Sequence, residues 1–251
     1  MQAQQLYMDT ISNNLSNVNT TGFKRIKAEF QDLMYEALRE PGTRNVEGSL
    51  SPSGIEVGLG VKPAATQRIF EQGSVLGTEN PLDVAIEGDG LFQITLPDGS
   101  IAYTRDGSFK LSADGTLVTS SGFMLFPQIT IPQGSTKPEI SADGNVSVYL
   151  PGESSPTEIG QIEIARFVNP SGLRGLGDNL FAETEASGAP VVLTPGEEGA
   201  GTLRQSFLES SNVQVVQEMV NMISAQRAYE IVSKAITVSD DMLQVANNIK
   251  R

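Results

Sequence analysis

The 251-residue chain contains no histidine, no cysteine and no tryptophan. Histidine and cysteine are the commonest ligands of zinc and other transition metals, histidine is the usual general base, and a cysteine thiolate is the usual sulfur nucleophile. Their absence closes the ordinary routes to catalysis, so we expect no enzyme activity, no cofactor and no metal. It also excludes a disulfide, which means that cysteine usage gives no indication of compartment.

Long apolar runs are absent as well. A membrane-spanning helix needs about 20 predominantly apolar residues, and the sequence has no run approaching that length. The start of the chain shows no basic segment followed by an apolar block, so we expect no cleaved secretory signal. We therefore expect no direct insertion into a membrane.

The motifs that mark nucleotide-dependent enzymes are also missing. No Gly-x-Gly is followed by a third glycine three residues later, and no Gly-Lys pair exists. Asp83, Glu87 and Asp89 lie close together in sequence, but carboxylates beside a turn are usually solvated surface groups. A glycan-processing enzyme stays open as an alternative, for which the first indication would be two carboxylates about 5–9.5 Å apart in a cleft.

Basic residues are scarce in the middle of the chain. Residues 41–202 carry 8 basic and 20 acidic residues, whereas residues 1–40 carry 4 and 5, and residues 203–251 carry 5 of each. The difference of −12 in the middle accounts for nearly all of the net charge of −13. An acidic middle argues against nucleic acid, which requires a basic footprint, and fits a protein whose middle faces water while its ends are buried in an assembly.

The last forty residues repeat apolar positions every three or four residues, with one gap of eight where Arg227 lies on the stripe, and this period predicts a helix. Ser211 with Gln214 fits a capping box, so we expect the helix to start at Ser211 and to reach on the order of 55 Å. One helix cannot bury such a stripe alone, and something must cover it. The stripe consists of Val213, Val216, Val220, Ile223, Ile231, Ala235, Val238, Met242, Val245 and Ile249.

The N-terminal segment shows the same period. Met8, Ile11, Leu15 and Val18 step by three and four, and Gly22 follows as a helix-ending glycine. A second helix is predicted from Phe23 to Glu40, ending before a proline. The terminal helices are either an ordinary pair of core helices or arms that pack against copies of the same protein.

The middle of the chain shows β signals. Short apolar runs alternate with Asp-Gly pairs, and such pairs favour hairpin turns because their glycines adopt positive φ. None of these turns has the ligand pattern of an EF-hand calcium loop. The pairs lie at residues 89–90, 98–99, 106–107, 114–115 and 143–144.

These signals predict an α+β fold with a discontinuous helical domain and an inserted β domain. Residues 1–40 and 203–251 are expected to form the coiled-coil-like terminal helices, and residues 74–202 the mainly antiparallel β domain. Residues 41–73 form a connector between them. Its first part is rich in Gly, Pro, Ser and Thr, which is typical of a flexible linker.

The end of the connector alternates apolar residues with polar or small ones. Ile55, Val57, Leu59 and Val61 share one face of a predicted strand. This segment either folds back on its own chain as a hairpin or docks onto an adjacent subunit, and we expect the second.

Three motifs resemble those of the axial proteins of the bacterial flagellum. Residues 11–24 resemble their rod-motif signature, residues 80–92 and 103–109 resemble their shared β core, and residues 211–236 resemble their C-terminal helix. The motifs follow the family order and together span nearly the whole chain. Chain length and the segment 52–61 resemble the distal rod members, with proximal rod and hook paralogues as the alternative.

The resemblance implies a structural subunit that polymerises with itself into a hollow helical shaft. That shaft would span the periplasm at the flagellar basal body and transmit torque from motor to hook. It further implies type III export, contacts with proximal rod and hook proteins, and surrounding ring proteins. A different class also stays open: a secreted β-domain binding module whose helices merely dimerise it.

Subunit packing is the role expected for the apolar residues of the terminal segments and the connector. These residues are Met8, Ile11, Leu15, Val18, Phe23, Ile55, Val57, Val213, Val216, Val220, Ile223, Ile231, Val238, Met242 and Val245.

Overall fold

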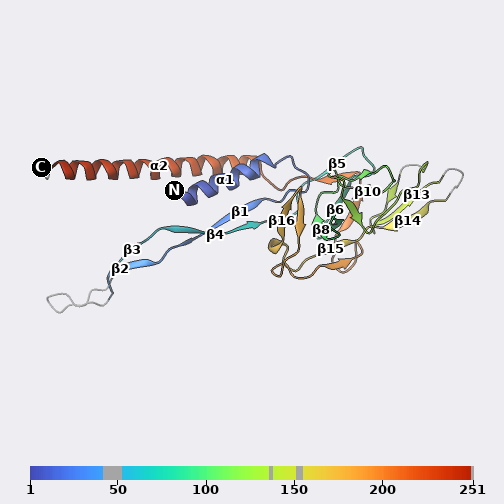
Figure 1. The fold of residues 1–251 in the computed structure, drawn as a ribbon, viewed down its shortest axis with the longest axis horizontal. Helices are drawn as coiled ribbons and strands as arrows, with labels where there is room; N and C mark the ends of the chain where they lie inside the picture. Colours follow the sequence, from blue (N-terminus) through green and yellow to red (C-terminus); the bar gives the residue numbers. More distant parts are fainter. Residues whose placement is uncertain (42–52, 136–137, 151–154, 250–251) are drawn as a thin grey trace. The chain divides into compact units, whose positions relative to one another are not determined.

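A computed structural model describes residues 1–41, 53–135, 138–150 and 155–249 (Figure 1). Helix α1 (Gln2–Ser16) opens the chain and helix α2 (Val215–Ile249) closes it, with a short 3-10 helix at Pro170–Gly172. The described strands all lie between α1 and α2, which confirms the predicted α+β class. They are β1 (Ile26–Asp32), β2 (Tyr35–Arg39), β3 (Ile55–Gly58), β4 (Val61–Arg68), β5 (Val75–Gly77), β6 (Val84–Glu87), β7 (Leu91–Thr95), β8 (Ile101–Thr104), β9 (Lys110–Leu111), β10 (Leu117–Val118), β11 (Met124–Phe126), β12 (Glu139–Ile140), β13 (Asn145–Val148), β14 (Thr157–Gln161), β15 (Ile164–Arg166), β16 (Arg174–Gly177), β17 (Leu180–Ala182), β18 (Val191–Leu193), β19 (Thr202–Gln205) and β20 (Phe207–Glu209).

Contacts between Cα atoms divide the chain into two compact units. The terminal unit consists of Met1–Asn13, Ile26–Gln67 and Val216–Arg251. The β unit consists of Asn14–Arg25 and Arg68–Val215. Each unit is thus built from segments that lie far apart in the sequence. In the described part of the chain, no helix is both long and apolar enough to cross a bilayer.

The β unit is built on a nine-stranded antiparallel sheet. Its strand order is β16-β17-β8-β7-β11-β10-β9, and β15 pairs with both β7 and β18. The pairs β19–β6 and β20–β5 join strands from the two ends of the unit, and β12, β13 and β14 form a separate three-stranded sheet. Since successive side chains of a strand point to opposite faces, the large sheet contributes to two apolar clusters. One cluster includes Phe92, Ile94 and Phe109, and the other includes Leu91, Tyr103 and Phe167.

The Asp-Gly pairs fulfil two different roles. Those at 98–99, 114–115 and 143–144 connect paired strands, and their glycines have φ of 81°, 79° and 85°, so they are the predicted hairpin turns. Those at 89–90 and 106–107 do not connect paired strands. A Cβ on Gly107 would lie 1.7 Å from the carbonyl oxygen of Val84, so glycine is required there by a close backbone approach.

The helix predicted from Phe23 to Glu40 is wrong. The structure has β1 and β2 there, which pair antiparallel with β4 and β3 respectively. Backbone bonds from Leu33 N to Gly60 O (2.8 Å) and from Leu59 N to Met34 O (3.3 Å) continue the pairing between them. The four strands therefore make one two-stranded ribbon, and a partner distant in sequence overrides the local helical spacing.

The ribbon also shows which of the two alternatives for the connector holds for its backbone. The segment from Ile55 to Val61 folds back on its own chain as a hairpin, so its backbone is paired within the chain and not with a strand of another subunit. Residues 42–52, the first part of the connector, lie outside the described residues. Edge-to-face contact between the rings of Tyr7 and Phe30, with centroids 6.2 Å apart, packs α1 against the ribbon within the terminal unit.

Both long helices are shorter than predicted. α1 ends at Ser16, so Val18 and Gly22 lie in the turns that follow it. Gly22 has φ 67°, and a Cβ there would lie 2.6 Å from the backbone nitrogen of Asp106. α2 begins at Val215 because Ser211 Oγ accepts a bond from Val213 N (3.3 Å) in a turn before the helix, so Ser211 does not cap it.

Candidate assembly site

The apolar stripe of α2 is exposed along its length. Val216 is 76% exposed and Ile231 is 69% exposed, although both are the kind of side chain that folding normally removes from water. Val213 is buried, but it precedes the helix. The side chain of Ile249 lies outside the described residues. The other members of the stripe within the helix are all exposed: Val220, Ile223, Ala235, Val238, Met242 and Val245.

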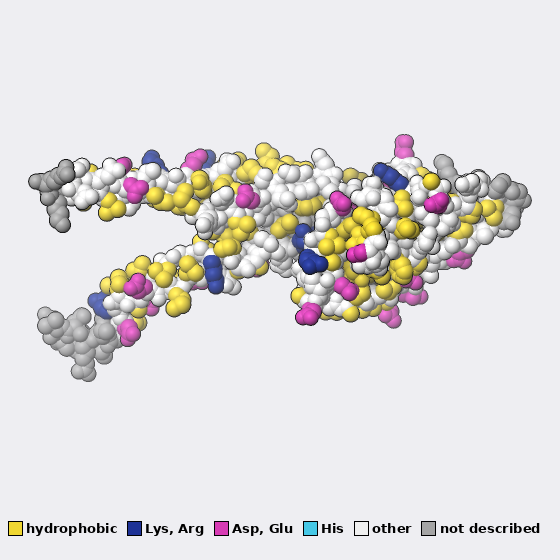
Figure 2. Space-filling view, in the orientation of Figure 1, with side chains coloured by type: hydrophobic (Ala, Val, Ile, Leu, Met, Phe, Trp, Pro, Cys, Tyr) yellow, Lys and Arg dark blue, Asp and Glu magenta, His cyan; other side chains and the backbone are white. Residues whose placement is uncertain are grey.

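The buried positions of α2 lie on its other side. Glu218 and Ala225 are 3% and 2% exposed. At about 3.6 residues per turn they lie roughly 140–160° around the helix from the centre of the stripe. Every residue from Lys234 to Asn248 is exposed. The two buried positions of the helix thus carry a carboxylate and a methyl group, whereas the stripe stays exposed, and Figure 2 shows hydrophobic side chains along the surface of α2.

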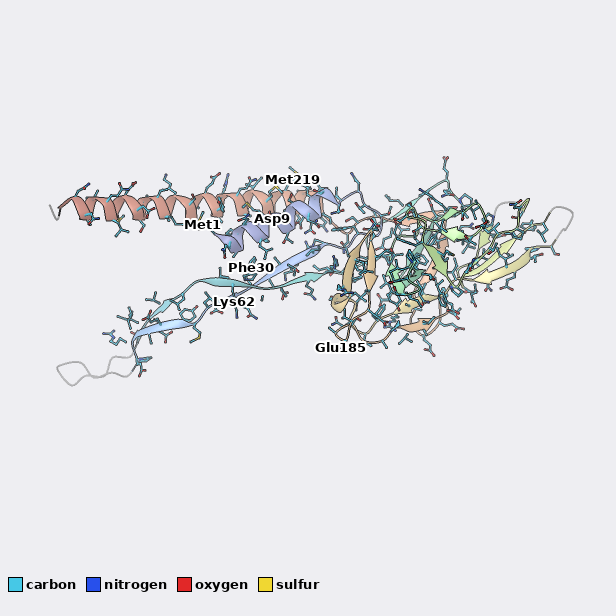
Figure 3. The ribbon with its side chains drawn as sticks, viewed as in Figure 1. Met1, Asp9, Phe30, Lys62, Glu185 and Met219 are labelled. Atoms are coloured by element: carbon cyan, nitrogen blue, oxygen red, sulfur yellow. The ribbon has the colours of Figure 1, made fainter. Side chains whose placement is uncertain are left out.

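The ribbon carries a second exposed apolar surface. Ile55 and Val57 on β3 are exposed, as predicted packing residues would be before assembly, and Met34 and Leu38 on the opposite strand segment are exposed too. Figure 3 shows side chains projecting along the length of both α2 and the ribbon, including the labelled Met219 and Lys62.

The predicted packing residues near the N-terminus lie differently. Ile11 is buried within its own chain, and Met8, Leu15, Val18 and Phe23 are partly buried. These residues thus already contribute to intramolecular packing, whereas the stripe of α2 does not.

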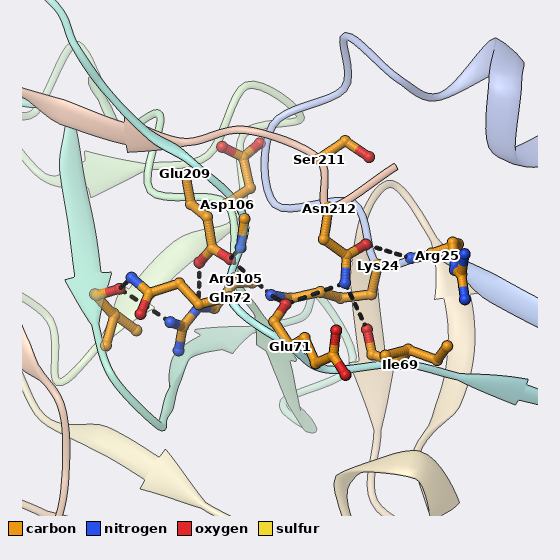
Figure 4. A network of polar contacts seen from close by, with 12 residues as sticks. Lys24, Arg25, Ile69, Glu71, Gln72, Arg105, Asp106, Glu209, Ser211 and Asn212 are labelled. Atoms are coloured by element: carbon orange, nitrogen blue, oxygen red, sulfur yellow. Dashed lines mark hydrogen bonds and ion pairs between the residues drawn. The ribbon is translucent and has the colours of Figure 1, made fainter. Parts of the chain in front are cut away.

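A buried ion-pair network lies in the β unit and was not predicted (Figure 4). Glu209 at the end of β20 bonds Lys24 Nζ through Oε1 at 2.6 Å and Arg105 Nε through Oε2 at 2.5 Å. All three side chains are almost completely buried. They come from three chain segments that enter the unit at different points of the sequence.

Backbone groups complete the network. Lys24 Nζ also donates to Glu71 O at 2.8 Å, and Gly73 N donates to Glu209 Oε1 at 2.8 Å. Arg105 donates further to the carbonyl oxygens of Ile86 (2.9 Å), Gly88 (2.5 Å) and Gly90. Buried charges are tolerated when paired and hydrogen-bonded in this way.

Asn212 extends the connections to the neighbouring segments. Its amide nitrogen donates to Ile69 O at 2.9 Å, and its Oδ1 accepts from Arg25 N at 2.7 Å. The network and Asn212 together bind the N-terminal turn, the segment after β4, the loop after β8 and the segment before α2 (Figure 4).

The causes of the pKa shifts of Lys24 and Glu209 agree with an ion pair between charged side chains. Burial lowers the pKa of Lys24, and the Glu209 carboxylate opposes that effect. Burial alone would raise the pKa of Glu209, but the charges of Arg105 and Lys24 outweigh it and hold the pKa below its ordinary value. The carboxylate is thus kept charged as a structural partner.

Sequence reasoning missed this network because pairing across the chain leaves no local pattern. A signal was present in the motifs themselves: Lys24 closes the first motif, Arg105 lies within the second, and Asn212 lies within the third. Three motifs recognised separately therefore meet in one place.

The three carboxylates considered for catalysis differ in exposure and partners. Asp83 is buried and accepts a bond from Asn80 Nδ2 at 2.8 Å, which corrects the expectation of a solvated surface group. Glu87 and Asp89 are exposed. Among the described residues, no group of three or more acidic side chains could hold a metal ion.

Three family models match the chain. They describe the "Flagella basal body rod protein" at residues 1–24, the "Flagellar hook protein FlgE/F/G D1 domain" at residues 85–148, and the "Flagellar basal body rod FlgEFG protein C-terminal" at residues 204–249. The matches fall on the three regions that carry the motifs.

Full-length relatives are similar as well. The chain is 56% identical to the flagellar basal-body rod protein FlgG of Borreliella burgdorferi, across 100% of this chain and 96% of that protein. It is 53% identical to FlgG of Buchnera aphidicola from Acyrthosiphon pisum, across 97% and 94%. It is 38% identical to FlgG of Bacillus subtilis, across 100% and 96%.

Proposed function

The chain belongs to the FlgG family of flagellar basal-body rod proteins, and from this premise we propose that it is a structural subunit of the distal rod. The observation that carries the proposal is the exposed apolar stripe of α2, which Arg227 interrupts once and which the described part of the chain leaves exposed. A surface of this kind on a helix marks a site for contact with other polypeptides.

The mode of assembly follows from geometry. A contact between α2 of one copy and the ribbon of the next would join unlike surfaces and would be heterologous, and heterologous contacts that do not close generate helical filaments. The subunits accordingly form a hollow helical tube that transmits torque. The terminal segments, residues 1–40 and 203–251, form its inner wall, and residues 74–202 face outward.

The ribbon has a second role in the same assembly. Its backbone is paired within the chain, so its contribution to a neighbour is made by the side chains of Ile55 and Val57 rather than by strand addition. These side chains dock onto an adjacent subunit and stiffen the tube. The chain reaches the periplasm-spanning rod by flagellar type III export, and it meets proximal rod, hook and ring proteins there.

Imaging of assembled material tests the proposal. Purified chain should form hollow tubes in electron micrographs, and the gene should restore motility to a bacterium that lacks its own distal rod subunit. Val220→Asp and Ile223→Asp should abolish tubes and motility, because burying an unpaired carboxylate costs several kcal/mol. Since both sites are exposed in the monomer, thermal unfolding of the β unit should not change.

A matched variant separates the apolar stripe from helix surface in general. Gln244 is exposed and lies roughly 110° around α2 from the centre of the stripe, so Gln244→Asp should assemble normally. If Val220→Asp still formed normal tubes, the stripe of α2 would have no role in subunit packing. A stable dimer that never elongates would instead favour the secreted binding module.

A further inference from the structure

A cavity of about 190 Å³ lies within the β unit beside the ion-pair network. Lys24 and Arg105 are among its lining residues, and Arg166 and Asp89 add two exposed charges. Its apolar lining includes Phe70, Leu91, Ala165, Phe167, Val168 and Pro170. The cavity is many times larger than the roughly 10–15 Å³ that one water requires, so it has room for a short side chain.

The hydrogen bonds of the two buried cations leave donors unused. An ammonium group has three N–H donors, and Lys24 uses two of them, for Glu71 O and Glu209 Oε1. A guanidinium group has five, and Arg105 uses four, for Glu209 and the three carbonyl oxygens at positions 86, 88 and 90. One charged donor on each remains without a partner among the described residues, which is costly in a buried place.

The charges around the cavity leave a positive excess. Lys24, Arg105 and Arg166 contribute three positive charges, and Asp89 and Glu209 contribute two negative ones. A single carboxylate would balance this excess and accept both unused donors. Its aliphatic stem would contact the apolar lining.

We propose that this cavity is a binding site for a carboxylate, which in the assembled rod is an Asp or Glu side chain of a second copy of this chain. Charge complementarity favours that occupant, because residues 41–202 carry 20 acidic and 8 basic residues. The proposal rests on the proposed function for the identity of the occupant. It links subunit contact directly to the network of Glu209.

Acetate is a direct probe of the cavity. Titrated into the full-length monomer below its assembly concentration, acetate should cause saturable chemical-shift changes at the backbone amides of Gly90 and Arg105. Acetamide, which is neutral, should cause none, and sodium chloride at matched ionic strength controls for screening. Shifts from acetate that do not saturate, or that chloride reproduces, would overturn the site.

Two substitutions at the cavity test its role in assembly. Val168 is 88% exposed and lines the cavity, so Val168→Trp should block entry without disturbing the core. Arg166→Glu reverses one of the charges. Each should abolish the acetate response and raise the protein concentration needed for tube formation at least tenfold.

Matched variants change similar residues away from the cavity. Arg174→Glu and Leu176→Trp alter an exposed cation and an exposed aliphatic side chain that do not line it, and both should assemble like the unmodified chain. If Val168→Trp and Arg166→Glu also assemble like the unmodified chain, a neighbour does not use the cavity. Failure of the unmodified chain to form tubes would count against the proposed function, while the acetate titration would still report on the cavity.

Discussion

The β unit and the terminal unit place their apolar residues differently. In the β unit, two clusters remove side chains such as Phe92, Ile94 and Phe109 from water. In the described part of the terminal unit, the buried hydrophobic residues are Ile11, Ala28 and Ala225, whereas α2 and the ribbon expose many larger ones. The first unit has a core of its own, and the second has apolar surfaces that the described part of the chain leaves exposed.

The difference has an energetic consequence. Complete burial of an aliphatic side chain contributes about 1.5–3 kcal/mol, so covering the stripe of α2 offers a large favourable term for assembly. That term is partly offset by the lost freedom of the associating subunits. In the proposed assembly, stability of the monomer would therefore depend on the β unit, and stability of the polymer would depend on the terminal unit.

The largest predicted effect is a loss of stability in the β unit when Glu209 is substituted. Glu209→Gln leaves Lys24 and Arg105 as buried cations without their counter-ion, and breaking a buried pair in this way costs about 3–5 kcal/mol. Urea unfolding of the monomer should show that loss in the β unit. Glu29→Gln is the control: its pair with Lys27 is exposed, with 3.9 Å between the charged atoms, and is worth less than about 1 kcal/mol. If both variants lost the same unfolding free energy, the buried network would stabilise the chain no more than the exposed pair does.

Acid should weaken the β unit through the same residue. The pKa of Glu209 is lower in the folded chain than its ordinary value of 4.5, so the unfolded chain binds a proton first. The stabilisation is therefore fully present above pH 4.5 and is lost as the pH falls through the folded value. Urea unfolding of the monomer between pH 7 and pH 3 should show the decline, and Glu209→Gln should flatten it. If stability declined just as steeply with falling pH in Glu209→Gln, other carboxylates would be the cause of the acid sensitivity.

Substitutions on the ribbon should lower the stiffness of the polymer and leave the stability of the monomer unchanged. In the double variant Ile55→Thr with Val57→Thr, the β-branched replacements keep the strand, and both sites are exposed, so unfolding free energy should change by no more than about 0.5 kcal/mol. The assembled tubes should bend more easily, because two apolar contacts to the neighbour are removed. Persistence length measured from electron micrographs checks this, and unchanged stiffness would make the ribbon a tether only.

The smallest effects should come from the carboxylates of the β unit. Glu87→Gln changes an exposed side chain and should alter stability by less than about 0.5 kcal/mol. Asp83→Asn weakens the bond from Asn80 and should cost about 1 kcal/mol. Neither should change assembly or motility in the complementation assay. A loss of motility with fold and tubes intact would restore the enzyme interpretation.

Local periodicity predicted the parts of the fold that depend on local spacing. The helical period of the last forty residues identified α2 and its apolar stripe, and Asp-Gly pairs identified three hairpin turns. The same reasoning failed for β1 and β2, because apolar residues spaced by three or four also occur in a strand whose partner lies far away.

The candidate site shows the same distinction between features set by local spacing and features set by residues distant in sequence. The exposed stripe was visible in the sequence as a face without an obvious partner. Lys24, Arg105 and Glu209 could not be joined from the sequence, since no spacing rule connects residues that are 81 or more positions apart along the chain. Gly107 shows the same limit: its need for glycine comes from Val84 O, which is distant along the chain.

The two-stranded ribbon also bears on how the chain behaves before it is incorporated. A long ribbon with open outer edges invites association with other strands in the wrong register, the first step toward amyloid-like fibres. Pro63 on β4 has no N–H to offer such a strand, and Lys62 beside it adds a charge that repels stacking (Figure 3). Pro63 and Lys62 therefore oppose the addition of a further strand to this edge of the apolar ribbon.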